Sequence, residues 1–145
     1  MKRFRVKKKP TKAKPWRLVL ETTEAALNLY SILWSFRSEM GAHVLNDEAL
    51  AYVEVWLGLI ESAVPSILTL AEDERGPFRE RDNRQIHLVM PLDDKERELM
   101  LFICQLIYQQ MLQPEERERW IQNQGQADYD MAVTHYRGWI GELTS

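Results

Sequence analysis

Apolar residues recur about every three or four positions through most of the chain after residue 22, which is the spacing of one helix face. A first helix is predicted over Thr23–Met40, with Thr22 or Thr23 as its N-cap. Tyr30 and Trp34 lie one turn apart on it and are placed to pair. Its few polar side chains form one narrow stripe of Asn28, Ser31 and Ser35. We therefore expect this helix to be largely buried.

Four further helices follow from the same spacing, combined with residues that start or stop helices. They are, in chain order, a helix capped by Asn46 and kinked or ended at Pro65, a central helix over about 94–113 capped by Asp93, a short charged helix over 114–124, and a final amphipathic helix that carries Tyr129 to Leu143. The central helix is apolar almost all round, so we expect it to lie inside the molecule.

Two segments are rich in branched and aromatic side chains, as strands are. Trp16–Glu21 is predicted as one strand, and residues 86–90, closed by Pro91, as another. Phe4 and Val6 alternate with basic residues and are consistent with a third short strand. The predicted fold is helix-dominated α+β: about five helices packed with a small two- or three-stranded sheet formed by the N-terminal segment and residues 86–90.

The chain has 145 residues, 45% of them hydrophobic, which is enough for one globular domain with its own core. We place that domain at residues 16–145 and treat residues 1–15 as a basic N-terminal arm, which could itself be an edge strand. The single cysteine, Cys104, excludes an internal disulfide, and its apolar surroundings predict a buried, unreactive thiol.

The longest stretch without a charged residue, residues 99–114, is too short and too polar to span a bilayer, since it contains four glutamines. No signal peptide is visible at the start of the chain, where basic residues lead into a proline-containing segment and not into an apolar one. We therefore expect a soluble, intracellular (cytoplasmic) protein that makes no contact with a membrane.

Charge is divided unevenly along the chain, although the net charge is only −3. Residues 1–17 contain nine lysines and arginines and no acidic residue, whereas the other 128 residues contain 10 basic and 22 acidic ones, a net charge of −12. Such a split favours a segment that attaches to a polyanion. The predicted nucleic-acid-binding residues are Lys2, Arg3, Arg5, Lys7, Lys8, Lys9, Lys12 and Lys14, with Trp16 to stack on an exposed base.

Three other interpretations of the basic arm stay open: a solubilising tail, an import address, or a segment that folds back on the acidic body. No helix-turn-helix, zinc-finger or RNA-binding signature accompanies the arm. Because the acidic body repels phosphate, nucleic-acid contact should be confined to the arm.

The charged segment 72–85 contains Gly76-Pro77 and is the clearest loop in the chain. Its arginines surround Phe78, and an exposed aromatic beside arginines is typical of a protein-binding hot spot. Trp120 is expected to be half covered and to act as a second anchor. The predicted protein-binding residues are Arg75, Phe78, Arg79, Arg81, Arg84 and Trp120. For the loop itself, a solvated connection with self-cancelling charge is the favoured alternative.

The residues that carry chemistry give little support for an enzyme. Asp128, His135 and Glu142 are seven residues apart on the last helix, so they share a face on which a metal or acid–base site is conceivable. A solvent-facing polar stripe is the favoured interpretation, because metal sites need three or more converging ligands. We expect no catalytic residues, no metal site and no cofactor.

The preferred hypothesis is a non-enzymatic accessory protein that docks on a nucleic-acid-containing assembly, with the arm on phosphate and the acidic helical body on protein. A second hypothesis is a protein-binding regulator or inhibitor without nucleic-acid contact. In size, tryptophan content and charge split the chain is similar, in a general way, to small accessory proteins that phages use to bind host machinery such as the transcription apparatus. A small metal-dependent enzyme is a third, weaker hypothesis. The expected partner is a larger protein or nucleoprotein assembly.

Overall fold

The computed structural model describes residues 14–40 and 46–144. The described elements are β1 (Trp16–Thr22), α1 (Thr23–Ser35), η3 (Phe36–Met40), α3 (Asp47–Ala63), η4 (Pro65–Thr69), η5 (Glu72–Glu74), β2 (Gln85–Leu92), α4 (Asp94–Met111), α5 (Pro114–Gln124) and α6 (Gln126–Thr144). Five α-helices and one two-stranded sheet in these residues confirm the helix-dominated α+β prediction.

Three of the helices begin where the sequence places a capping side chain. Thr22 accepts a hydrogen bond from the Ala25 amide at 3.1 Å, and Asn46 caps α3 in the same way through the Ala49 amide at 2.8 Å. Asp93 caps α4 reciprocally with Glu96: each side chain accepts a hydrogen bond from the other's backbone amide. The start of a helix is thus fixed by contacts within three residues.

The ends of the helices differ from prediction in two places. The first helix is α-helical only to Ser35 and continues over Phe36–Met40 as a wider π-helical turn. The central helix ends at Met111 and not at residue 113, because Gln113 precedes Pro114 and adopts the extended backbone that a following proline favours.

The two strands pair antiparallel, with Leu18 opposite Met90 and Leu20 opposite Leu88. Leu18, Leu20 and Met90 are fully buried, whereas Arg17, next to Leu18, is exposed, so one face of the sheet covers the core. The third strand that Phe4 and Val6 would form lies outside the described residues.

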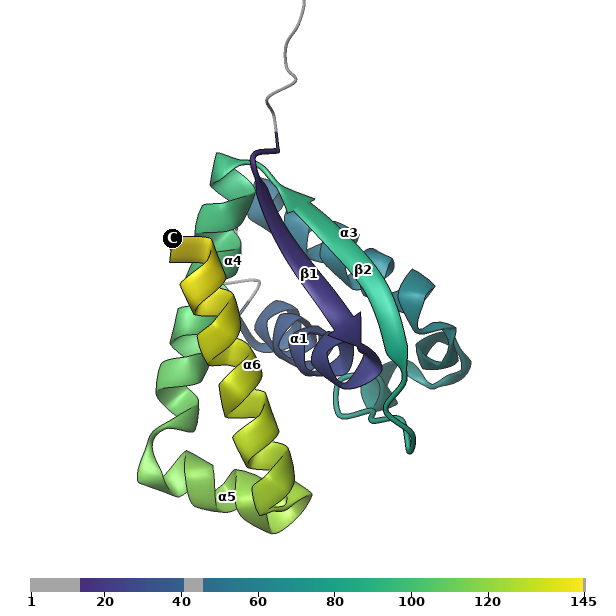
Figure 1. Cartoon of the computed structure of the whole chain (residues 1–145), viewed down its shortest axis with the longest axis vertical. Helices are drawn as coiled ribbons and strands as arrows, with labels where there is room; N and C mark the ends of the chain where they lie inside the picture. The colour runs from purple at the N-terminus through teal and green to yellow at the C-terminus, as the bar shows by residue number, and fades with distance from the viewer. Residues whose placement is uncertain (1–13, 41–45, 145) are drawn as a thin grey trace, which may run out of the picture.

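The helices surround this small sheet (Figure 1). α1 packs against β1, α3 lies on the β2 side, and α4 and α6 lie side by side next to β1. α5 crosses the far end of the α4–α6 pair and is the only one of the five described helices without a buried residue. α1 and α5 therefore face each other across a cleft that residues within 73–79 also line.

Candidate functional site

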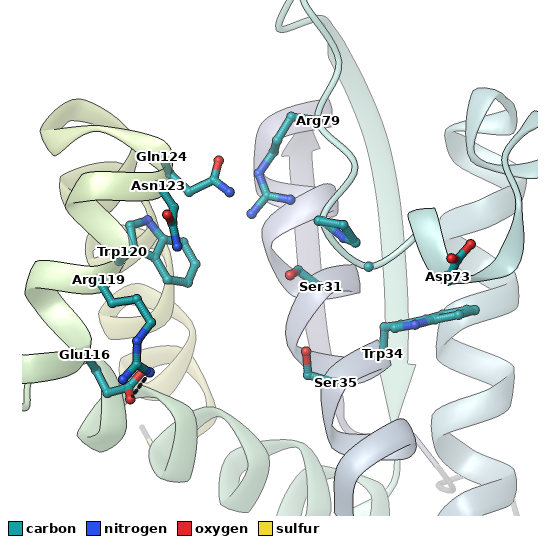
Figure 2. Close-up of a pocket in the computed structure, with 12 residues that line it drawn as sticks. Ser31, Trp34, Ser35, Asp73, Arg79, Glu116, Arg119, Trp120, Asn123 and Gln124 are labelled. Carbon is teal, nitrogen blue, oxygen red and sulfur yellow. Dashed lines mark hydrogen bonds and ion pairs between the residues drawn. The ribbon is translucent and has the colours of Figure 1, made fainter.

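A cleft of about 310 Å³ lies on the outer side of α1, between α5 and the segment that follows η5 (Figure 2). Ser31 and Ser35, from the predicted polar stripe of α1, turn their hydroxyls toward this opening. Trp120 and Gln124 face it from α5, and Arg79 reaches into it from the opposite loop. Three segments far apart in the sequence therefore build one concave surface.

The cleft continues past Trp120 into a second hollow of about 190 Å³. Ser31, Ser35, Glu116 and Trp120 border both volumes, and the second is further lined by Ile32, Ile107, Gln110 and Met111. Both parts of the groove therefore combine apolar with polar side chains, an arrangement suited to an amphipathic ligand.

The loop side of the cleft is held in place by contacts with Trp34. The Trp34 ring stacks on Tyr30 at 5.7 Å between centroids, as the spacing predicts, and the Arg37 guanidinium lies 4.2 Å from its centre. Gly76 packs so closely on this ring that an added Cβ would lie 2.8 Å from Trp34 Cδ1. Glycine at this position therefore allows the loop to approach α1.

Asn28 fixes the position of Arg79. This fully buried amide accepts a hydrogen bond from Arg79 Nη2 at 3.2 Å and pairs through Nδ2 with Nδ1 of His135 at 2.9 Å. The Tyr136 hydroxyl donates to its backbone carbonyl at 3.3 Å. Arg79 Nη1 donates to the Phe78 carbonyl at 2.8 Å, so within the described residues the guanidinium is held by neutral acceptors.

The loop that carries Arg79 is tied to the start of α1. The Thr23 amide donates to the Arg84 carbonyl at 2.9 Å, and the Asn83 side chain accepts from the Glu24 amide at 3.1 Å. Arg84 forms a two-point ion pair with Glu80, and this pairing holds the pKa of the Glu80 carboxyl below its usual value. These contacts make the loop a fixed wall of the cleft.

Three buried polar atoms around the cleft have no hydrogen-bond partner within the described part of the chain: Nε of Arg79, Nε1 of Trp120 and Oδ2 of Asp128. Arg79 and Asp128 both line a small hollow of about 90 Å³ behind the cleft, yet they form no ion pair. Buried polar groups are nearly always satisfied in folded proteins, so these three atoms are candidates for contact with water or a ligand.

Two of the predicted protein-binding residues, Arg79 and Trp120, meet at the cleft, and Trp120 is half-buried as expected. Phe78 is not the exposed aromatic that we expected, because it is half-buried against the core. The remaining predicted residues lie outside the cleft lining: Arg75 donates to the Leu70 carbonyl, Arg84 pairs with Glu80, and Arg81 is exposed.

Only the end of the basic arm lies within the described residues; Lys2, Arg3, Arg5, Lys7, Lys8, Lys9 and Lys12 lie outside them. Lys14 forms an ion pair with the buried Glu96. The Trp16 indole donates to Asp94 at 3.0 Å, and the Arg97 guanidinium lies 4.5 Å from its centroid. Both side chains are thus engaged by α4, so base stacking by Trp16 would require the loss of these contacts.

Asp128, His135 and Glu142 do not converge. Residues seven apart on a helix are separated by about 10 Å along its axis, and each of the three meets different neighbours. Burial lowers the pKa of His135, while burial and nearby Glu21 raise that of Glu142. Within the described residues, no group of three or more His, Cys, Asp or Glu side chains is placed to hold a metal ion.

The structure bears on two further predictions, that Cys104 is buried and that no segment spans a membrane. Cys104 is fully buried in α4, and burial raises the pKa of its thiol to about 12, in agreement with the predicted inert cysteine. None of the helices in the described segments is long and apolar enough to cross a bilayer.

Sequence reasoning identified the polar stripe of α1 but did not recognise it as the floor of a site. Ser31 and Ser35 lie within the cleft, and Asn28 at the start of the stripe orients Arg79. A polar stripe on an otherwise apolar helix was the available signal, because such a stripe needs either solvent or polar partners. Nothing local to α1 indicates which of the two it meets.

No protein-family model matches this chain, and no curated protein and no solved structure shows significant similarity to it.

Proposed function

We propose that this chain is a non-enzymatic binding module that holds a segment of a partner protein in the groove between α1 and α5. The observation that carries the proposal is the groove itself: a half-buried tryptophan and an arginine that has no carboxylate partner among the described residues face one concave surface. Tryptophan and arginine are the residues most enriched at the energetic centres of protein interfaces.

The size and the polarity of the groove support a peptide ligand. Its main part, at about 310 Å³, is at the lower end of the range for small-molecule sites. It also continues on the other side of Trp120, and on both sides its lining combines apolar with polar side chains. An amphipathic protein segment would match both sides and would cover the exposed half of the indole.

Selection from a displayed library of random peptides tests the proposal. Peptides selected on the full chain should bind the unmodified protein and lose at least about tenfold in affinity on two opposite variants. Trp120→Ala removes one side of the groove, whereas Ser31→Phe fills its floor. Because the two variants change the volume in opposite directions, a shared loss locates the ligand in the groove.

Met131→Ala provides the control, since Met131 is an exposed apolar residue of α6 away from the groove lining. Circular dichroism and thermal unfolding establish that each variant is folded. Failure to select any peptide, or equal binding of the selected peptides by all three variants, would contradict the proposed function.

The charge split supports a second component of the function, attachment to a nucleic-acid-containing assembly through the arm. Nine cations in residues 1–17 against a net charge of −12 in the rest concentrate attraction for phosphate at one end of the chain. The acidic remainder would face the protein part of such an assembly.

Salt titration of binding to a generic duplex and to a single strand tests this component. Replacement of Lys7, Lys8 and Lys9 by glutamine should reduce the slope of log affinity against log salt by about 2–3 for a duplex. The matched control replaces Arg81, Arg117 and Arg137, three exposed cations of the body, and should leave the slope unchanged. Equal slopes for the two triple variants would remove the nucleic-acid component and leave the groove proposal intact.

A further inference from the structure

We propose that the partner segment carries an aspartate or glutamate that pairs with Arg79, next to a large apolar side chain that enters the hollow beyond Trp120. The inference rests on the proposed function, because it specifies the chemistry of the segment that the groove would hold. It depends on three features. The Arg79 guanidinium has N–H donors without a partner in the described residues, the other charged groups nearby are ion-paired or exposed to water, and apolar side chains line the hollow beyond Trp120.

Arg79 is a cation of the groove lining with no ion-pair partner in the part of the chain that the structure describes. A guanidinium has five N–H donors, yet the contacts of Arg79 in the described residues are two neutral oxygens, from the Phe78 carbonyl and the Asn28 side chain. Its Nε is buried and has no partner there. A positive charge that has lost part of its water gains most from a carboxylate, which can accept two parallel hydrogen bonds from the planar group.

The other charged groups that line the groove are expected to bind a ligand less strongly than Arg79. Arg119 is already paired with Glu116 on the same turn of α5. Asp73 is exposed at the rim, where water screens its charge. In Figure 2, the Arg79 guanidinium points into the opening toward Gln124, whereas Asp73 stands at the edge. Arg79 is therefore the charged group of the lining that turns into the opening without an ion-pair partner in the described residues.

Glu24 and Glu80, the second already paired with Arg84, border the same small hollow as Arg79. Asp128 is a further carboxylate there that could compete. It lines the small hollow that Arg79 also borders, but it does not line the main cleft. No ion pair joins it to Arg79, and its Oδ2 stays unsatisfied. Asp128 therefore leaves Arg79 available on the cleft side, and its removal should not weaken a carboxylate bound there.

The hollow beyond Trp120 selects the second side chain. Ile32, Ile107, Met111 and the indole form its apolar lining, against which a large apolar side chain would be removed from water; the polar side chains of Ser31, Ser35, Gln110 and Glu116 complete the lining. Its volume of about 190 Å³ suits one large apolar side chain. Arg79 borders the main cleft but not this hollow, and Trp120 borders both, which sets the acidic and apolar residues on opposite sides of the indole.

The peptides selected on the full chain provide the test. We expect enrichment of aspartate or glutamate within a few positions of phenylalanine, leucine, isoleucine or methionine. Exchange of the acidic residue for its amide in a selected peptide should weaken binding roughly ten- to a hundredfold, as expected for loss of a charge-assisted hydrogen bond. This exchange uses the unmodified protein, so it is decisive even if a protein variant folds poorly.

Protein variants assign the effect to Arg79. Arg79→Gln should weaken binding of the acidic peptide by the same factor and abolish the protein's preference for the acidic over the amide peptide. Arg81→Gln, in the same loop, should change neither the affinity nor the preference. Asp128→Asn should preserve or tighten binding of the acidic peptide. Amide peptides that bind as tightly as acidic ones, while Trp120→Ala and Ser31→Phe still abolish binding, would overturn this inference and leave the proposed function standing. Loss of acidic-peptide binding in Asp128→Asn would also overturn it.

Discussion

Asn28 joins three parts of the molecule through one side chain and one carbonyl. It belongs to α1, its amide meets Arg79 of the loop and His135 of α6, and its carbonyl receives the Tyr136 hydroxyl. The sequence shows Asn28 as part of a polar stripe, but its partners lie 51 and 107 positions away. Hydrogen bonds over such separations leave no periodic pattern, so the stripe could be predicted and its role could not.

The same contact predicts that stability depends on the protonation of His135. Nδ1 accepts a hydrogen bond from Asn28, which requires the neutral ring, and burial lowers the pKa of His135 below its usual value of 6.5. The unfolded chain therefore takes up a proton first as the pH falls. The contribution is complete above about pH 6.5 and is lost as the pH falls from there toward the folded-state pKa.

Urea unfolding from about pH 8 to about pH 5 measures this effect. Subtraction of the His135→Gln profile from that of the unmodified protein should leave a decline on the acidic side that the carboxylates shared by both do not explain. His87→Gln changes an exposed histidine of β2 and should preserve the decline. Parallel profiles for the unmodified protein and His135→Gln would contradict the assignment.

Gly76 is the residue at which the close approach of loop and helix can be tested. Gly76→Ala places a methyl group 2.8 Å from Trp34 Cδ1, and this aromatic ring is held between Tyr30 and Arg37. We expect a loss of about 1–3 kcal/mol in the free energy of unfolding, because the loop or the ring must shift. A chemical-denaturation curve measures it.

The matched substitution is Gly138→Ala in α6, where an added Cβ meets nothing within 4 Å. There alanine should stabilise the protein by about 0.5–1 kcal/mol, since glycine in the interior of a helix is unfavourable. Equal effects at the two glycines would show that the Gly76 contact is not tight.

At the scale of elements, the parts of the fold that could be predicted are those with local causes. The N-caps Thr22, Asn46 and Asp93 act on amides three residues ahead, so the starts of α1, α3 and α4 follow from the sequence. The wider turn over Phe36–Met40 does not, because the preceding apolar pattern continues through it unchanged. The prediction that Phe78 is exposed was wrong for a related reason: the composition of a loop does not show which of its side chains pack on the core.

Asp93 offers a test of how much a local cap contributes. Its side chain accepts from the Glu96 amide at 2.8 Å, while the Glu96 side chain accepts from the Asp93 amide at 2.9 Å. Asp93→Ala should lower the free energy of unfolding by about 1 kcal/mol, because the first turn of α4 loses an acceptor. Glu98→Ala, an exposed change one turn later, should stay within about 0.5 kcal/mol of the unmodified protein. Equal losses would argue against the cap.

At the scale of the whole molecule, the groove joins a well-packed side to a loosely packed one. α1 contributes nine buried residues to the molecule, whereas α5 contributes none and is attached mainly through the half-buried Trp120 and Ile121. Such a division is expected at a binding site, since elements that respond to ligands come from the less stable parts of a fold. It follows from tertiary packing, and the charged sequence of α5 alone indicates only that the helix is exposed.

Hydrogen exchange measured by mass spectrometry should therefore separate the two sides of the groove. Backbone amides of α5 should exchange well before those of α1, because α5 can open without exposure of the central core. A selected peptide bound across Trp120 would have to hold α5 against α1 to keep its contacts with Arg79 and with the hollow beyond the indole. Its addition should slow exchange in α5 and leave α3, on the β2 side of the sheet, unchanged. Protection that appeared in α3 but not in α5 would place the ligand on another surface, even if the peptide bound tightly.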